Sequence, residues 1–337
     1  MGFGTKFKRL RSFHKSTKFG SLWNLLHGFS AKSVELNGIT SQNYKEFISD
    51  RQYFMGHPYN GLYSTIIDNK LYLPYLLKNF PEHTPRYFYF LNGEILRLAN
   101  DGGARVPFEE FRELLHDQGR LVLKHTCSSR GEGFYLLEAD GERGCLLNKE
   151  PRSWEAVEQF ILSLDHYIVT EYVQQHHYAS EVNASSLNTI RMICAWDEER
   201  GAFRLMRCFH RFGNDGALVD NVAKGNSCTV FVDTETGVLQ EGTMERDGKR
   251  SYTQSVTHAS GRLLTGMQVP NFCQIRDKVL EISSSLPFLR YVGWDVAVTE
   301  DGFRVIEANS LPDLGMNQRK GGYLADAVLR KIFTGKR

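Results

Sequence analysis

Two short apolar segments near the C-terminus, joined by a turn, constrain this chain more than any other feature. Residues 293–298 read Gly-Trp-Asp-Val-Ala-Val, a turn containing Asp301-Gly302 follows, and residues 305–309 read Val-Ile-Glu-Ala-Asn. An Asp-Gly turn between apolar segments is a strong signal for a β-hairpin. The sequence therefore predicts antiparallel pairing in its C-terminal part.

The predicted hairpin carries three oxygen-bearing side chains near its strand ends. Asp295 lies on the first strand, and Glu307 and Asn309 lie two residues apart on the second, so these two point to the same face. Hard oxygen ligands in an incomplete site suit Mg²⁺, which keeps positions for water and phosphate. The alternative is a solvated acidic edge, but Glu307 follows two apolar residues, where an unpaired charge is costly.

Bulk properties narrow the class of protein. The 337 residues are 41% hydrophobic with a formal net charge of +2, as expected of a globular protein and with no case for nucleic acid as a partner. The six cysteines are scattered without metal-ligand spacing, which predicts reduced thiols and a cytoplasmic location. Neither a membrane-spanning run nor a signal peptide is evident.

The N-terminal segment is more basic than the rest of the chain. Its basic residues alternate with apolar ones, namely Lys6, Lys8, Arg9, Arg11, Lys15 and Lys18 with Phe3, Phe7, Leu10 and Phe13. A frayed, solvated terminus is the favoured interpretation. A weak contact with an anionic membrane surface is the alternative.

The order of the predicted elements favours an α+β protein rather than a doubly wound parallel sheet. Residues 1–65 are predicted to be mainly helical, and a helix is predicted over 67–79. Strands and helices then alternate, with strands at 86–91, 94–98, 121–124, 134–138 and 167–173 and helices at 108–118 and 153–164. The C-terminal part has strands at 188–196, 203–210, 229–233 and 238–240, and a helix at 271–286, before the hairpin.

A lysine and a glycine-rich loop form the first candidate for a phosphate site. Lys124 ends a predicted strand, and the loop that follows contains Ser129, Gly131 and Gly133. Glycines permit close approach of backbone amides to a phosphate, and the lysine adds a point charge. A hairpin with a flexible tip explains the same residues.

The strand at 167–173 is a candidate for binding a base. It reads Tyr-Ile-Val-Thr-Glu-Tyr-Val, and its last three residues, Glu171, Tyr172 and Val173, offer backbone groups at an exit edge. A surface glutamate on an edge strand is the alternative.

Basic residues gather on the strands that follow. Asn188 precedes Arg191, Arg211 follows His210, and Asp220-Asn221 comes next. Arginines on neighbouring strands suit phosphate oxygens, although cross-strand ion pairing explains any single one. Because no nucleophile motif is present, catalysis would depend on positioning and charge.

Together these motifs resemble the ATP-grasp superfamily, and within it the sugar-transfer associated ATP-grasp proteins. The resemblance covers about residues 66–325 and rests on Leu123-Lys124 with its glycine loop, Thr-Glu-Tyr-Val, Ser-Leu-Asn-Thr-Ile-Arg, Val-Asp-Asn, and the Gly-Trp-Asp-Val-Ala-Val and Val-Ile-Glu-Ala-Asn pair. It implies two α+β subdomains clasping ATP, at 66–173 and 174–337, after a helical region at 1–65.

The resemblance also implies roles for individual residues. ATP would be bound by Lys70, Lys124, Ser129, Gly131, Gly133, Glu171, Tyr172, Val173 and Asn188. The triphosphate and an acyl phosphate would face Arg191, Arg211 and Asn221, and Mg²⁺ would be held by Asp295, Glu307 and Asn309. The implied enzyme is a ligase that activates a carboxylate on a small molecule, peptide or sugar-linked precursor and joins it to an amine, releasing ADP and phosphate.

Two departures leave the substrates open. Lys224-Gly225-Asn226 stands where typical members have two glycines, and the first 65 residues lack the βαβ pre-domain common in amide ligases. A kinase with His210 or Asp220 as general base is the alternative enzyme. A nucleotide-sensing protein at a membrane is the non-enzymatic alternative, and the intact metal set argues against it.

Overall fold

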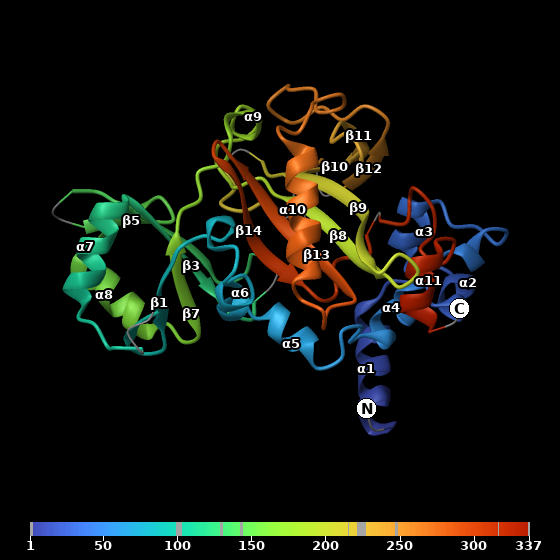
Figure 1. Ribbon diagram of the computed structural model, residues 1–337, viewed down its shortest axis with the longest axis horizontal. Helices are drawn as coiled ribbons and strands as arrows, with labels where there is room; N and C mark the ends of the chain where they lie inside the picture. The colour runs from blue at the N-terminus through green and yellow to red at the C-terminus, as the bar shows by residue number, and fades with distance from the viewer. Residues whose placement is uncertain are drawn as a thin grey trace.

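Two seven-stranded antiparallel sheets organise the chain (Figure 1). The computed structural model describes residues 3–98, 103–128, 131–141, 144–214, 216–220, 227–246, 249–315 and 317–335; for 3–9, 245–246 and 249–250 it describes the backbone alone. The first sheet is formed within residues 87–171 and the second within residues 190–309. The mixed, antiparallel α+β class predicted from the sequence is confirmed.

The first sheet has the strand order β2-β1-β7-β3-β4-β5-β6. Its strands are β1 (Tyr87–Leu91), β2 (Ile95–Arg97), β3 (Arg120–His125), β4 (Phe134–Ala139), β5 (Gly144–Leu147), β6 (Glu150–Ser153) and β7 (Tyr167–Glu171). Helices α7 (Phe108–Gln118) and α8 (Trp154–Ser163) pack on one face. Leu121 and Leu123 of β3 face these helices, whereas Val122 and Lys124 alternate to the opposite face.

Both helices of this layer begin and end where the sequence predicts. Helix α7 has Glu109 and Glu110 in its first turn and ends at Gly119, whose φ is 70°. The Ser153 hydroxyl caps α8 by accepting a hydrogen bond from the Ala156 N–H.

The second sheet has the order β12-β11-β10-β9-β8-β13-β14. Its strands are β8 (Ile190–Asp197), β9 (Ala202–Phe212), β10 (Cys228–Val232), β11 (Leu239–Arg246), β12 (Lys249–Thr253), β13 (Tyr291–Thr299) and β14 (Gly302–Asn309). Helix α10 (Phe272–Ser284) crosses one face (Figure 1), where Ile275, Val279 and Ile282 meet Trp294. Helix α11 (Ala327–Thr334) and the N-terminal helices cover one end of the other face and leave its opposite end open.

The N-terminal region is helical, as predicted. Its elements are α1 (Phe3–Ser16), α2 (Leu22–His27), α3 (Ala31–Asn37), a 3-10 turn at Tyr44–Glu46, α4 (Asp50–Gly56), α5 (Tyr63–Asp68), 3-10 turns at Lys70–Tyr72 and Pro81–His83, and α6 (Leu73–Leu76) between these two turns. A further short helix, α9 (His177–Ser180), follows β7.

The single helix predicted over 67–79 is wrong. Helix α5 ends at Asp68, and Asn69 is extended, with φ −96° and ψ 113°. The Asn69 side chain caps the next turn by accepting a hydrogen bond from Leu71 N–H, and the Lys70 N–H donates instead to the Thr126 carbonyl. The break fixes Lys70 beside the loop that follows β3, a tertiary contact that local periodicity does not encode.

Two further observations bear on the class of protein. All six cysteines are free, and only Cys127 and Cys273 are exposed. Among the described residues, no helix combines the length and the apolar character needed to cross a membrane.

Candidate functional site

A cavity of about 770 Å³ lies between the two sheets. Its first wall comes from β3, β4 and β7, and its second from β8, β9, β13 and β14 with the segment that follows β14. Apolar side chains from both walls line part of it, namely Val122, Leu136, Val173, Leu218 and Ile306. A space of this size, with apolar walls and a few charged groups, is typical of a small-molecule site.

An irregularity in the C-terminal hairpin aims its polar residues into the cavity. Asp295 pairs with Glu307, but the next pair is Val296 with Val305, so Ile306 is an extra residue on β14. Such a β-bulge interrupts the alternation of faces. Val305 therefore points into the core, while Ile306, Glu307 and Asn309 all line the cavity.

Two arginines clamp Asp295. Arg191 lies opposite Asp295 on the neighbouring strand and bonds to both of its carboxylate oxygens, and Arg211 contributes a third contact at 3.0 Å. Burial works to raise the pKa of Asp295, but the two guanidinium groups outweigh it and hold the pKa below its usual value. Asp295 is thus a buried carboxylate anion in a paired cluster.

Asp220 extends the same cluster. Its carboxylate accepts hydrogen bonds from the N–H and hydroxyl of Thr189 and lies 3.6 Å from Arg211 Nε. Burial raises the pKa of Asp220, although Arg211 and Thr189 oppose this. Burial also works to lower the pKa of Arg211, but the surrounding carboxylates raise it. The arginines of the second wall are therefore already neutralised by acidic partners.

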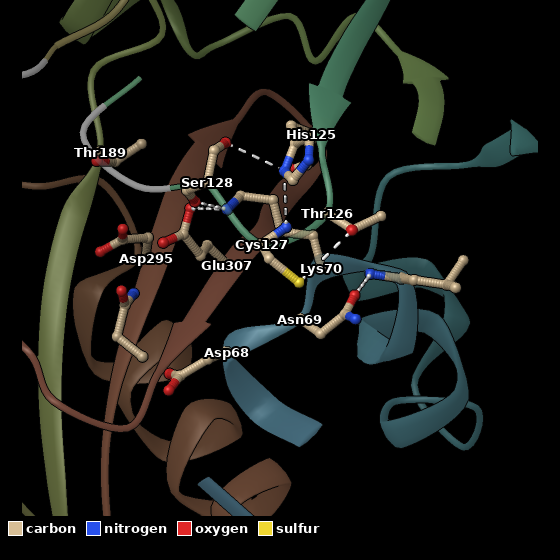
Figure 2. A network of polar contacts seen from close by, with 12 residues as sticks. Asp68, Asn69, Lys70, His125, Thr126, Cys127, Ser128, Thr189, Asp295 and Glu307 are labelled. Carbon is tan, nitrogen blue, oxygen red and sulfur yellow. Dashed lines mark hydrogen bonds and ion pairs between the residues drawn. The ribbon is translucent and has the colours of Figure 1, made fainter. Parts of the chain in front are cut away.

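Lys70 crosses the gap between the walls. Figure 2 shows its ammonium group between the Ser128 carbonyl, at 2.6 Å, and the Glu307 carboxylate, at 3.5 Å. The side chain is 9% exposed, so little solvent competes for these contacts. Lys70 thus joins the loop after β3 to the hairpin of the second sheet.

Lys124 is half-buried and close to Lys70, without an ion-pair partner within 4 Å among the described residues. Burial lowers its pKa from 10.5 to about 8, because the charged form loses its hydration. Glu307 opposes this shift, and the positive charge of Lys70 adds to it. A phosphate arriving here would supply the missing counter-charge.

The end of β7 forms the edge of the cavity. Glu171 pairs with Arg86 at 2.7 Å, which answers the need of this charge for a partner. Tyr172 lies under the Arg120 guanidinium at 4.3 Å, and Val173 is buried. From here the chain passes toward the second sheet, so this segment connects the two walls.

Two glycines in the loop after β3 line the cavity. Gly131 has φ 69°, and a side chain there would come within 2.8 Å of Val219 on the facing segment. Gly133 has φ 65°, and a Cβ would come within 2.8 Å of the Tyr167 hydroxyl. Both positions need glycine for backbone conformation and for close approach.

The family profile described as sugar-transfer associated ATP-grasp matches residues 49–332, most of the chain. The chain belongs to the sugar-transfer associated ATP-grasp family. The match begins earlier than the resemblance predicted from motifs, so α4 is part of the family region. No curated protein matches the chain.

Several solved ATP-grasp structures are similar to this family member. They include the ligase PsnB with a minimal precursor (14% identity, 77% of this chain and 57% of that one, TM-score 0.39) and D-alanine–D-alanine ligase from Bacillus anthracis (13%, 79% and 64%, 0.38). D-alanyl-alanine synthetase A from Vibrio cholerae O1 biovar eltor is a third (10%, 82% and 66%, 0.41). The chain spans less than two thirds of the length of these proteins, and the likeness carries no argument about activity.

The cavity brings together most of the site residues that were predicted from the sequence. Those lining it are Lys70, Lys124, Gly131, Gly133, Glu171, Tyr172, Val173, Arg191, Arg211, Asp295, Glu307 and Asn309. Ser129 and Asn221 lie outside the described residues. Their roles as ligands remain predictions.

Asn188 is the exception. Its side chain is 1% exposed and bonds to Gln175 and to the carbonyls of Ala179 and Asn183, while Gly213 N–H donates to it. It does not line the cavity, so the geometry gives it a structural role in holding the start of β8 against the preceding loop. Its neighbour Thr189 reaches the cavity instead.

The oxygen donors fit Mg²⁺ unequally. Glu307 and Asn309 line the cavity two residues apart. The Asn309 amide nitrogen points to the Gly293 carbonyl at 3.5 Å, and its oxygen has no hydrogen-bond donor among the described residues, so it can bind an ion. Asp295 has both oxygens bound to arginines. It would hold a metal only by exchanging one of these contacts, a limit that sequence spacing did not reveal.

Sequence reasoning missed one wall of the cavity. Tyr53 and Phe54 of α4, Phe13 of α1 and Lys32 of α3 line its far end. The only signal was that three of the four are aromatic, because nothing in a sequence places an N-terminal helix beside a hairpin some 240 residues later.

Proposed function

We propose that this protein is an ATP-dependent ligase that activates a carboxylate as an acyl phosphate and joins it to an amine. The supporting observation is one cavity that places two lysines on one side and an arginine pair with three oxygen donors on the other. That arrangement suits a triphosphate bound across two walls. ATP is the nucleotide expected from the family.

In this proposal each wall has a separate task. The apolar residues Val122, Leu136 and Ile306 sandwich the adenine, and the backbone at 171–173 binds its edge. Lys70 and Lys124 contact the phosphates as point charges. Arg191 and Arg211, held by Asp295, face the charge that develops on the transferred phosphoryl group. Bound Mg²⁺, at Glu307 and Asn309, would neutralise phosphate charge.

The far end of the cavity is the proposed place for the carboxylate and the amine. It is lined by Tyr53, Phe54 and Lys32 from the N-terminal helices and by residues 311–315 after β14. Lys32 is exposed and can pair with a carboxylate. The family description and this mixed lining are compatible with a small molecule, a peptide or a sugar-linked precursor. The cytoplasmic location predicted from the free thiols is retained as part of the proposal.

The kinase alternative receives less support from the geometry. His210 is fully buried, its ring nitrogens lie 2.6 Å from the Tyr178 hydroxyl and 3.2 Å from the Arg211 carbonyl, and it does not line the cavity. Burial lowers its pKa to about 3, so it is neutral, but it cannot reach a substrate. Asp220 does line the cavity, yet its carboxylate is bonded to Thr189.

The experiment begins with thermal melting in Mg²⁺ alone, in ATP with EDTA, and in ATP with Mg²⁺. A ligand at about one hundred times its Kd stabilises a protein by about 2.7 kcal/mol, so a shift of several degrees is expected with ATP and Mg²⁺ together. Carboxylates and amines are then screened in pairs for release of phosphate from ATP. Phosphate release that needs both substrates supports the ligase, whereas transfer of phosphate to a hydroxyl without release refutes it in favour of the kinase.

A further inference from the structure

The positive charge of this protein is concentrated in its first 34 residues. They contain seven lysines and arginines and no aspartate or glutamate. The remaining residues hold 34 basic and 39 acidic side chains, a net charge of −5 against +2 for the whole chain. Such asymmetry is typical of a segment that meets an anionic partner.

Helix α1 carries much of this charge in its sequence and projects from the body of the protein (Figure 1). Figure 1 shows α1 projecting beyond the other helices, with the N-terminus at its free end. Its C-terminal turn is anchored by Phe13, which is buried and stacks on Phe54 of α4 at 5.8 Å. Arg11 and Lys15 are exposed. In the sequence of α1, Phe3, Phe7 and Leu10 recur every three to four residues, as in an amphipathic helix.

Helix α2 follows directly and exposes leucines instead of burying them. Leu22 is 71% and Leu26 is 65% exposed, and Leu25 lies between them at 36%. The short helix is fixed in place, because Ser21 caps it and the Arg51 guanidinium bonds to the Leu25 and Leu26 carbonyls. A rigid helix that holds three leucines in solvent next to a cationic helix is unusual for a surface that only water contacts.

We infer that α1 and the exposed leucines of α2 form a docking surface for an anionic lipid bilayer. Lysines and arginines are attracted to the negative headgroups, and the leucines enter the boundary between headgroups and acyl chains. The charge of the segment is complementary to this partner, and the leucines distinguish it from a nucleic acid, which offers no apolar phase. With no spanning helix among the described residues, the contact is peripheral.

The docking surface adjoins the far end of the cavity. Phe13 and Phe54, which join α1 to α4, are themselves cavity-lining residues. A bilayer bound by α1 and α2 would therefore lie next to the end of the cavity that is opposite the lysines. The inference about the bilayer stands without the proposed reaction, because it uses other residues.

The test measures co-sedimentation of the full-length protein with vesicles of phosphatidylcholine, alone or mixed with phosphatidylglycerol. Binding is expected only to the mixed vesicles and should weaken with salt. The double variant R11Q/K15Q should bind about tenfold or more weakly, from the usual effect of a surface cation near anionic lipid. The double variant L22S/L26S should also bind several-fold more weakly at the same net charge.

A matched control removes two charges elsewhere. Lys149 and Arg152 are exposed at the edge of the first sheet, where β5 and β6 lie, and K149Q/R152Q should bind like the unchanged protein. All variants are checked for an unchanged melting temperature, since every substituted side chain is exposed. If the wild type binds neither vesicle, or binds both equally, the inference is overturned. Tighter binding to a short DNA duplex, unaffected by L22S/L26S, overturns it in favour of a nucleic acid.

Discussion

The two walls of the cavity differ in whether their cationic side chains are paired with carboxylates. On the second sheet, the buried Arg191 and the half-buried Arg211 are paired with Asp295 and Asp220. On the first sheet, Lys124 is half-buried without a carboxylate within ion-pair distance among the described residues, and desolvation lowers its pKa to about 8. The arginines are positioned before any ligand arrives, whereas the lysine carries a desolvation cost that an anion would relieve. This difference indicates where a phosphate gains most on binding.

The largest expected effect comes from Glu307, which lies between the two walls. Glu307→Gln removes the charge that faces Lys70 and the proposed metal, so turnover should fall by about 100-fold or more while the fold is retained. Phosphate release and thermal melting check this. Glu132→Gln, which changes another cavity-lining carboxylate, should be nearly neutral. Normal turnover in Glu307→Gln would remove Glu307 from the metal site.

The arginine clamp on the second wall is tested by Asp295→Asn. The buried Arg191 guanidinium would lose its carboxylate partner and the half-buried Arg211 would keep only Asp220, so the free energy of unfolding should fall by about 3–5 kcal/mol. Urea denaturation measures this. Asp277→Asn is the matched control, because Asp277 is itself exposed and its partner Arg276 keeps Glu235, so the change should cost less than about 1 kcal/mol. Equal small losses for both variants would contradict the contrast between the walls.

The first wall is tested by Lys124→Ala. Its affinity for ATP should be weaker by about 1–3 kcal/mol, because a charge-assisted contact to phosphate is lost. The free energy of unfolding should change far less than in Asp295→Asn. Among the described residues Lys124 has no ion-pair partner that its removal would leave unpaired. Titration calorimetry measures the affinity, and Lys78→Ala, an exposed lysine, provides the control. Unchanged ATP affinity would exclude Lys124 from the nucleotide site.

The smallest expected effect is a pH dependence of the affinity for ATP, which arises from Lys124 on the first wall. With a pKa of about 8 before binding, Lys124 is charged below pH 8, and bound phosphate favours the ammonium form. ATP affinity should therefore be constant below about pH 7 and fall, at most tenfold per pH unit, as pH rises through 8. Because the folded pKa lies below the ordinary 10.5, stability without ATP should rise over the same range.

Calorimetry in buffers of different ionisation enthalpy would detect the proton taken up with ATP. Lys124→Met should abolish both the slope and the proton uptake. A flat affinity of the unchanged protein between about pH 7 and 9.5 would contradict the lowered pKa of Lys124.

Much of the fold was predictable because its signals are local. The turn at Asp301-Gly302, the Ser153 cap and the Gly119 helix end each act within a few residues, and each is found where expected. The same locality explains the error at 67–79. Leucine spacing predicts a helix there, but Asn69 caps a new turn and Lys70 bonds to Thr126 across the fold.

The sequence by itself determined the α+β class, the family and the residue types gathered in the site, since these depend on periodicity, turn chemistry and motifs. Tertiary structure alone decided which groups meet. The bulge at Ile306 sends Glu307 and Asn309 into the cavity with it, the arginines occupy Asp295, and the N-terminal helices form the far wall. These outcomes depend on strand register and on packing between distant segments, and the local spacing of residues predicts neither.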